Sequence, residues 1–294
     1  MAELTIGMPV YNNAATLAAA LDSLLAQTFT DFRIVVSDDA STDKTGEIAL
    51  RYTERDRRIT YVRQARNLGY YGNYKFVLDR ADTPFFMWAA GDDRWMPRFA
   101  EANIAALRHD TDLVASISRV TFAADPPRPA TGTYPIRGTH KERLARYLAG
   151  CGACDMSRLF SVFRTDALKS AYPIPESFSF DVGLCAAALE HGAFHEVPEV
   201  LMVRDKTPVQ RYLALMRKEA PGGLAGYFPG LRATRWMLRE RRIPLNTRIA
   251  LALLAFNIDW HLAYTGQYCP RYSALTRPGR WLWERYVGWR LRPL

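Results

Sequence analysis

The first hundred residues alternate between short apolar runs and segments whose apolar side chains recur at helical spacing. The runs 4–10, 32–37, 59–63 and 84–90 have the length and composition of buried strands. Between them, helical spacing covers 14–27, the stretch from Ser41 or Thr42 to about Tyr52, and a stretch near 73–81. Because helices of this length join strands through crossovers, the pattern predicts an α/β fold with a mainly parallel sheet.

Polar residues mark the ends of these elements. We expect Asn12 or Asn13 to cap the first helix, and Asp43 to lie in the first turn of the second. A later helix is expected from about Pro97. Another should begin at Asp181, which precedes an apolar helical stretch.

Three polar clusters follow predicted strands: Tyr11-Asn12-Asn13, Asp38-Asp39 and Asp92-Asp93. Ligands of such sheets bind beyond the carboxyl ends of the strands, so we expect the three clusters to meet at one rim. The glycine-rich patterns that cradle phosphates are absent. A bound phosphate would then be neutralised by a cation beside Asp92 and Asp93, although an acidic turn ahead of the helix near Pro97 also explains this pair.

Composition and charge narrow the class of protein. The chain has 294 residues, 49% of them hydrophobic, which suits one large domain or one domain plus an appendage. We see no signal peptide, and the apolar run 249–258 is shorter than the roughly 20 residues of a membrane span. We therefore expect a cytoplasmic protein. The four cysteines are more consistent with reduced thiols than with disulfides. Cys151 and Cys154 form a Cys-x-x-Cys pair, but a redox or zinc site is not favoured because no second pair follows.

Several spaced motifs resemble glycosyltransferase family 2, the inverting sugar transferases with a GT-A fold. The opening "IGMPVYNNAATLAAALDSLLAQTFTDFRIVVSDDASTD" carries the family's Pro-x-Tyr-Asn, Gln-Thr and Asp-Asp-x-Ser-x-Asp patterns. The stretch "RNLGYYGNYKFVLDRADTPFFMWAAGDDRWMP" resembles the block that ends in the metal motif. Segments 157–168 and 180–204 resemble the region around the catalytic acid. The resemblance covers about residues 4–204.

The resemblance implies an enzyme that transfers a sugar from a nucleotide diphosphate sugar, with UDP-sugars favoured, to a saccharide or polyprenyl-linked acceptor in surface-glycan biosynthesis. It implies that Asp92, with Asp93 beside it, holds Mn²⁺ or Mg²⁺, and that Asp181 is the general base. The residues expected to bind the nucleotide are Pro9, Tyr11, Asn12, Asp38, Asp39, Arg66, Asn67 and Asp92. Without the resemblance, Asp181 is also explained as an ordinary acidic residue at a helix N-terminus. Arg66 is likewise explained as a solvated arginine in a loop.

Two departures from the family pattern stand out. Ala90 occupies the position of the usual first Asp of the metal motif, which removes part of the expected grip on ribose or metal. Asp181 follows Phe180, where the family often has Glu-Asp. The Gln-x-x-Arg-Trp signature of processive synthases is absent, so we expect one sugar to be transferred per encounter.

The last third of the chain differs in charge. Residues 1–204 have a formal net charge of −2, whereas residues 205–294 have a formal net charge of +11. We expect a catalytic domain over 1–204 and a basic, aromatic-rich, mostly helical region over 205–294. Its end, 277–294, interleaves arginine with tryptophan, which suits peripheral contact with an anionic membrane on the cytoplasmic face. Packing on the catalytic domain or an oligomer contact explains the same residues, and no pattern predicts the oligomeric state.

Two other functions fit parts of the sequence. Ala90 is compatible with a nucleotide-sugar-binding protein that does not catalyse transfer. The basic tail is compatible with binding single-stranded nucleic acid, but the acidic strand ends would repel phosphate. We therefore expect no nucleic-acid partner.

Overall fold

The computed structural model describes residues 2–124, 126–130, 132–150, 157–172, 174, 180–205, 231–239, 249–250 and 253. The chain groups into two compact units. The first comprises Met1–Pro135, Ser157–Ala171 and Gly192–Lys206, and it contains every strand of the described residues. The second contains the helices α5, α7 and α10.

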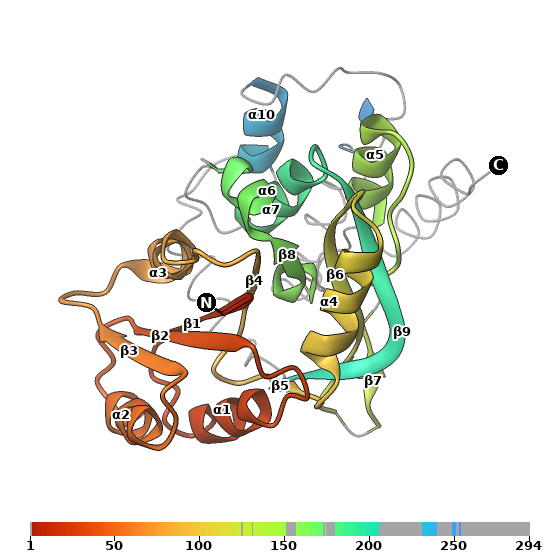
Figure 1. The fold of residues 1–294 in the computed structure, drawn as a ribbon. Helices are drawn as coiled ribbons and strands as arrows, with labels where there is room; N and C mark the ends of the chain where they lie inside the picture. Colours follow the sequence, from red (N-terminus) through yellow and green to blue (C-terminus); the bar gives the residue numbers. More distant parts are fainter. Residues whose placement is uncertain are drawn as a thin grey trace. The chain divides into compact units, whose positions relative to one another are not determined.

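The first unit is built on a single sheet with the order β3-β2-β1-β4-β8-β6-β9-β5, and β7 pairs with β6 (Figure 1). The first four strands of that order are parallel, and β8 then runs antiparallel between β4 and β6. The strands are β1 (Leu4–Val10), β2 (Phe32–Asp38), β3 (Ile59–Arg63), β4 (Phe85–Trp88), β5 (Arg94–Trp95), β6 (Leu113–Phe122), β7 (Arg128–Pro129), β8 (Val162–Arg164) and β9 (Ala193–Arg204). The predicted fold class is therefore confirmed, with antiparallel strands added beyond β4.

Helices cover both faces of the parallel part, with α1 and α2 on one side and α3 on the other (Figure 1). The close approach of α3 to β1 depends on Gly7, since a Cβ there would lie 2.7 Å from Val77 Cγ2. The helices of this unit are α1 (Leu17–Leu25), α2 (Thr45–Arg55), α3 (Gly69–Asp79), α4 (Phe99–His109), η1 (Ser157–Phe160) and α6 (Thr165–Ser170).

Two predicted helix starts were wrong. Helix α1 begins at Leu17, and neither Asn12 nor Asn13 caps it with a side chain. Helix α2 begins at Thr45, so Asp43 precedes the helix instead of lying in its first turn. Asn12 Oδ1 accepts from the amide of Thr42, and Asp43 Oδ2 accepts from the amide of Ala14, each in a neighbouring loop. The other oxygen of Asp43 accepts from the amide of Thr45, where α2 begins.

The second unit contains α5 (His140–Gly150), α7 (Phe180–Ala188) and α10 (Leu231–Arg239). The hydroxyl of Tyr147 in α5 donates to the carbonyl of Val182 in α7 at 3.3 Å. A Cβ on Gly183 would lie 3.5 Å from Trp236 of α10, so this glycine faces that helix. Helices α5 and α7, although within 1–204, thus group with α10 from the C-terminal third.

The predicted boundary after Arg204 stays a prediction, because most of 205–294 lies outside the described residues. The same holds for the predicted helical character of that region beyond α10, and for the pair Cys151 and Cys154. Within the residues that the structure describes, no helix is both long and apolar enough to cross a bilayer.

Candidate functional site

Three loops meet beyond the carboxyl ends of β1, β2 and β4, as expected from the strand order. The amide of Asp39 donates to the carbonyl of Val10 at 2.9 Å, which joins the end of β2 to the end of β1. The hydroxyl of Thr16 donates to the carbonyl of Gly91 at 2.7 Å, which joins the β1 loop to the loop after β4. A Cβ on Gly91 would lie 3.0 Å from Asn13 Cγ, closer than ordinary carbon contacts. The small residue therefore allows the two loops to approach.

The asparagines of the β1 loop hold the loops together. The backbone of Asn12 lies in the left-handed region, with φ of 54°, which asparagine tolerates better than most residues. Its side-chain oxygen accepts from the amide of Thr42 at 2.8 Å, and its own amide donates to Ser41 Oγ at 2.9 Å. Asn13 Oδ1 accepts from the amide of Tyr11 at 3.0 Å. These contacts occupy the side-chain oxygens that were expected to cap α1.

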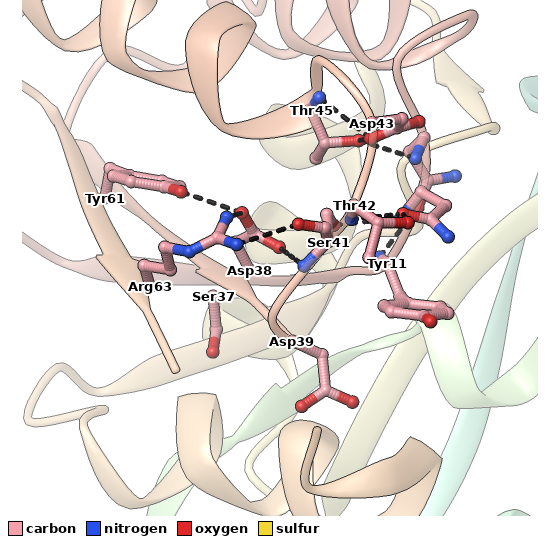
Figure 2. A network of polar contacts seen from close by, with 12 residues as sticks. Tyr11, Ser37, Asp38, Asp39, Ser41, Thr42, Asp43, Thr45, Tyr61 and Arg63 are labelled. Atoms are coloured by element: carbon pink, nitrogen blue, oxygen red, sulfur yellow. Dashed lines mark hydrogen bonds and ion pairs between the residues drawn. The ribbon is translucent and has the colours of Figure 1, made fainter. Parts of the chain in front are cut away.

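Asp38, the last residue of β2, is completely buried and surrounded by donors. Its Oδ1 accepts from the amide of Ser41 at 2.8 Å. Its Oδ2 accepts from the hydroxyl of Tyr61 at 2.7 Å and from Nη1 of Arg63 at 3.0 Å. Figure 2 shows the carboxylate facing these two residues of β3. The hydrogen-bonding capacity of Asp38 is therefore largely used within the protein.

Asp39 has different surroundings, although it is the next residue. It is 3% exposed, and its carboxylate points away from the Asp38 network (Figure 2). Its oxygens accept from the amides of Leu68 at 2.6 Å and Gly69 at 3.1 Å, at the start of α3. Burial raises the pKa of this carboxyl, and the two amide bonds partly oppose that rise.

The loop before α3 carries two more of the predicted nucleotide contacts. Asn67 Nδ2 donates to the carbonyl of Asp39 at 3.2 Å, so Asn67 is attached to the rim. Arg66 is exposed in the same loop. Tyr11, directly after β1, is 39% exposed. Pro9 lies inside β1, buried and in register with Ser37 of β2.

The two acids after β4 also differ. Asp92 is half-buried, whereas Asp93 is 2% exposed. Oδ1 of Asp93 accepts from the amide of Asp205 at 2.9 Å, and Oδ2 lies 3.4 Å from Nε of Arg204. Burial raises the pKa of Asp93 to about 7, while the nearby Arg204 acts to lower it. Asp93 therefore faces the end of β9, and Asp92 is the more accessible carboxylate.

A divalent cation would have few protein ligands here. Within the described ranges, no three His, Cys, Asp or Glu side chains come together as a metal site. One accessible carboxylate nevertheless fits Mg²⁺ or Mn²⁺, because such ions are often held by one or two carboxylates together with substrate phosphates and water. The acidic-turn alternative is weaker, since α4 begins at Phe99 and has no side-chain cap.

Asp181 belongs to the second unit. It lies in the first turn of α7, as predicted, and is 6% exposed. Its Oδ1 accepts from the amide of Val182 at 2.8 Å. This contact satisfies one amide at the helix N-terminus, where a carboxylate is also favoured by the helix dipole.

Sequence reasoning missed four residues that shape the rim. Tyr61 and Arg63 lie on β3 and hold Asp38, Thr16 holds Gly91, and Arg204 faces Asp93. No local pattern distinguishes them, because each acts on a residue that is distant in sequence.

Comparison with known proteins shows the family of this chain. The profile described as glycosyl transferase family 2 matches residues 5–170, more than half of the chain. The chain belongs to glycosyl transferase family 2. Glycosyltransferase GlyA of Streptococcus pneumoniae is 40% identical over 90 residues, which cover 27% of this chain and 13% of GlyA. The GalNAc(5)-diNAcBac-PP-undecaprenol beta-1,3-glucosyltransferase of Campylobacter jejuni is 34% identical over 94 residues, 32% of this chain and 30% of that one.

Solved structures share the fold of this family 2 chain. S. aureus TarS in complex with UDP-GlcNAc has a TM-score of 0.58 at 16% identity, covering 93% of this chain and 83% of that one. The mannosyltransferase PcManGT from Pyrobaculum calidifontis, in complex with GDP-Man and Mn²⁺, has a TM-score of 0.54 at 17% identity, covering 98% and 82%. These similarities confirm the GT-A type of fold. The curated relatives match over less than two fifths of their own length.

Proposed function

We propose that this chain is an inverting glycosyltransferase that moves a sugar from a nucleotide diphosphate sugar to a hydroxyl of a saccharide or lipid-linked acceptor. The observation that carries the proposal is the convergence of three strand-end loops, which brings the exposed ring of Tyr11, the carboxylate of Asp39 and the accessible Asp92 to one rim. Family membership and the relatives named as glycosyltransferases support it.

In the proposed complex, the base stacks on Tyr11 and its polar edge bonds to Asp39, with Asn67 and Arg66 beside the ribose and phosphates. Pro9 and Asn12 shape this loop. Asp38 contributes to nucleotide binding indirectly. The hydrogen bonds that it accepts from Ser41, Tyr61 and Arg63 hold the loop after β2 in place. UDP is the favoured nucleotide; TarS binds UDP-GlcNAc, whereas PcManGT binds GDP-Man.

Asp92 would hold Mn²⁺ or Mg²⁺ together with diphosphate oxygens of the donor, with Asp93 as its neighbour rather than a second ligand. An ion held by Asp92 would supply positive charge that stabilises the leaving diphosphate. Asp181 would accept the proton of the acceptor hydroxyl while that oxygen bonds to the anomeric carbon and the bond to the diphosphate oxygen breaks. Attack from the face opposite the leaving group inverts the anomeric configuration, and the nucleoside diphosphate departs.

The proposed setting is surface-glycan biosynthesis at the cytoplasmic face of a membrane. The C. jejuni relative is named for an undecaprenol-linked substrate, which supports a polyprenyl-linked acceptor. Residues 277–294, the proposed membrane contact, lie outside the described residues.

Metal-dependent donor binding and turnover test the proposal together. Titration of UDP into the protein should give sharply weaker affinity in excess EDTA than with Mn²⁺, and Asp92→Ala should reproduce the EDTA result. Release of UDP from UDP-GlcNAc or UDP-glucose, followed with and without Mn²⁺, then separates an enzyme from a binding protein. Metal-dependent binding without sugar transfer or hydrolysis would support the non-catalytic alternative. Binding that ignores both EDTA and Asp92→Ala would contradict the metal assignment.

A further inference from the structure

Arg204, the last residue of β9, is largely buried against the loop that carries Asp92. Its Nε lies 3.4 Å from Oδ2 of Asp93, and the two side chains are 17% and 3% exposed. The next amide, of Asp205, donates to the other oxygen of Asp93 at 2.9 Å. Both carboxylate oxygens of Asp93 therefore face the end of β9.

The guanidinium of Arg204 is itself held in place. Its Nη1 donates to the hydroxyl of Ser157 at 3.3 Å. The guanidinium carbon lies 4.8 Å from the ring centre of Phe160 and 5.5 Å from that of Phe122, within the range of cation–π attraction. Contacts from β6 and η1 thus restrict the side chain that faces Asp93.

Asp92 lies between two residues that are each tied to another element. On one side, the carbonyl of Gly91 accepts from Thr16 at 2.7 Å, which ties the loop to the β1 end. On the other side, Asp93 is tied to β9 through Arg204 and Asp205. The orientation of the Asp92 backbone is consequently set by contacts that its two neighbours make.

We propose that Arg204 is a positioning residue for metal binding, acting through Asp93 to hold Asp92 in the orientation that a divalent cation requires. The inference rests on the proposed function, because Asp92 is a metal ligand only under that proposal. A metal held by a single protein carboxylate depends strongly on where that carboxylate lies, since few other protein ligands can compensate.

The test measures Mn²⁺ affinity by electron paramagnetic resonance at saturating UDP and pH 8. Arg204→Gln should weaken Mn²⁺ binding at least tenfold, and Asp93→Asn should weaken it to a similar degree. The double variant should lose no more than Arg204→Gln alone, because residues that act through one contact are not additive. Arg204→Lys keeps the charge and should lose less, which covers the case in which Arg204→Gln does not fold.

Arg119→Gln is the matched control. Arg119 lies on β6 and pairs with Glu196 of β9 at 3.2 Å, so it joins the same two strands away from Asp92. This variant should keep the wild-type Mn²⁺ affinity. If Arg204→Gln acted only by disturbing β9, Arg119→Gln should weaken Mn²⁺ binding as well. Unchanged Mn²⁺ affinity in Arg204→Gln and Arg204→Lys, or losses that add in the double variant, would overturn the inference alone. A wild-type protein that binds no Mn²⁺ with UDP would overturn the proposed function as well.

Discussion

Tyr61 donates its phenolic hydrogen to Oδ2 of Asp38 at 2.7 Å, and this contact separates the roles of two adjacent acids. Asp38 accepts three hydrogen bonds from within the protein. Asp39, whose carboxylate points away from that network, accepts hydrogen bonds from two backbone amides at the start of α3. The same motif therefore supplies one residue that stabilises the loop and one that borders the proposed nucleotide site.

We predict that Asp38→Ala lowers stability more than it alters ligand recognition. Removing this buried acceptor leaves Tyr61, Arg63 and the Ser41 amide without their partner, at a cost of about 2–4 kcal/mol in the free energy of unfolding. Tyr61→Phe removes one donor and should cost about 1 kcal/mol. Asp39→Asn should weaken UDP binding instead. Urea denaturation and UDP titration measure the two effects. Wild-type stability in Asp38→Ala, with UDP binding lost, would assign Asp38 to the ligand.

The buried Asp93 should make stability depend on pH. Its pKa is about 7 in the folded protein, above the ordinary value of 3.8. Between these values the unfolded chain has released the proton and the folded protein retains it, so the free energy of unfolding falls as the pH rises from about 4 to about 7. Denaturation of Asp93→Asn in EDTA should lack this part of the pH dependence. Parallel curves for the two proteins across this range would contradict the assignment.

Asp181→Asn should separate chemistry from donor binding. As the proposed base, Asp181 accelerates the step in which the acceptor hydroxyl loses its proton, so turnover should fall by roughly 10² to 10⁴-fold. The affinity for UDP and Mn²⁺ should stay at the wild-type level. Initial rates and UDP titration on the same preparations provide the comparison. A variant that transfers sugar at the wild-type rate would require another acid as the base.

Removal of 277–294 should reduce binding to anionic vesicles. The region 205–294 balances at +11, and basic residues near interfacial tryptophans provide two additive membrane signals. We expect full-length protein to co-sediment with phosphatidylglycerol vesicles at low salt and to be released at high salt. The truncated protein should sediment less, yet transfer sugar to a soluble acceptor analogue. Equal sedimentation of both forms would leave packing or an oligomer contact as the explanation.

The sequence by itself determined the elements of the parallel sheet and the positions of its polar loops. The runs 4–10, 32–37 and 59–63 match β1, β2 and β3 to within one residue, because strand and helix periodicity is a local property of the chain. The position of Asp181 in the first turn of α7 was likewise predictable, because this polar residue precedes an apolar helical stretch. Helix starts were less predictable, since Asn12 bonds to the loop after β2, and Asp43 lies ahead of α2, where it accepts both from the amide of Ala14 in the β1 loop and from the amide of Thr45 at the start of α2.

Only the tertiary structure decided which carboxylates are buried and paired with side chains of the protein itself. Asp38 and Asp39 look alike in the sequence, as do Asp92 and Asp93, because adjacent identical residues carry the same local signal. Their surroundings differ because β3 places Tyr61 and Arg63 beside Asp38, and β9 places Arg204 beside Asp93. The partners of Asp93 are more than a hundred residues away along the chain. Burial and pairing at that separation depend on how strands are ordered in the sheet, which local periodicity does not encode.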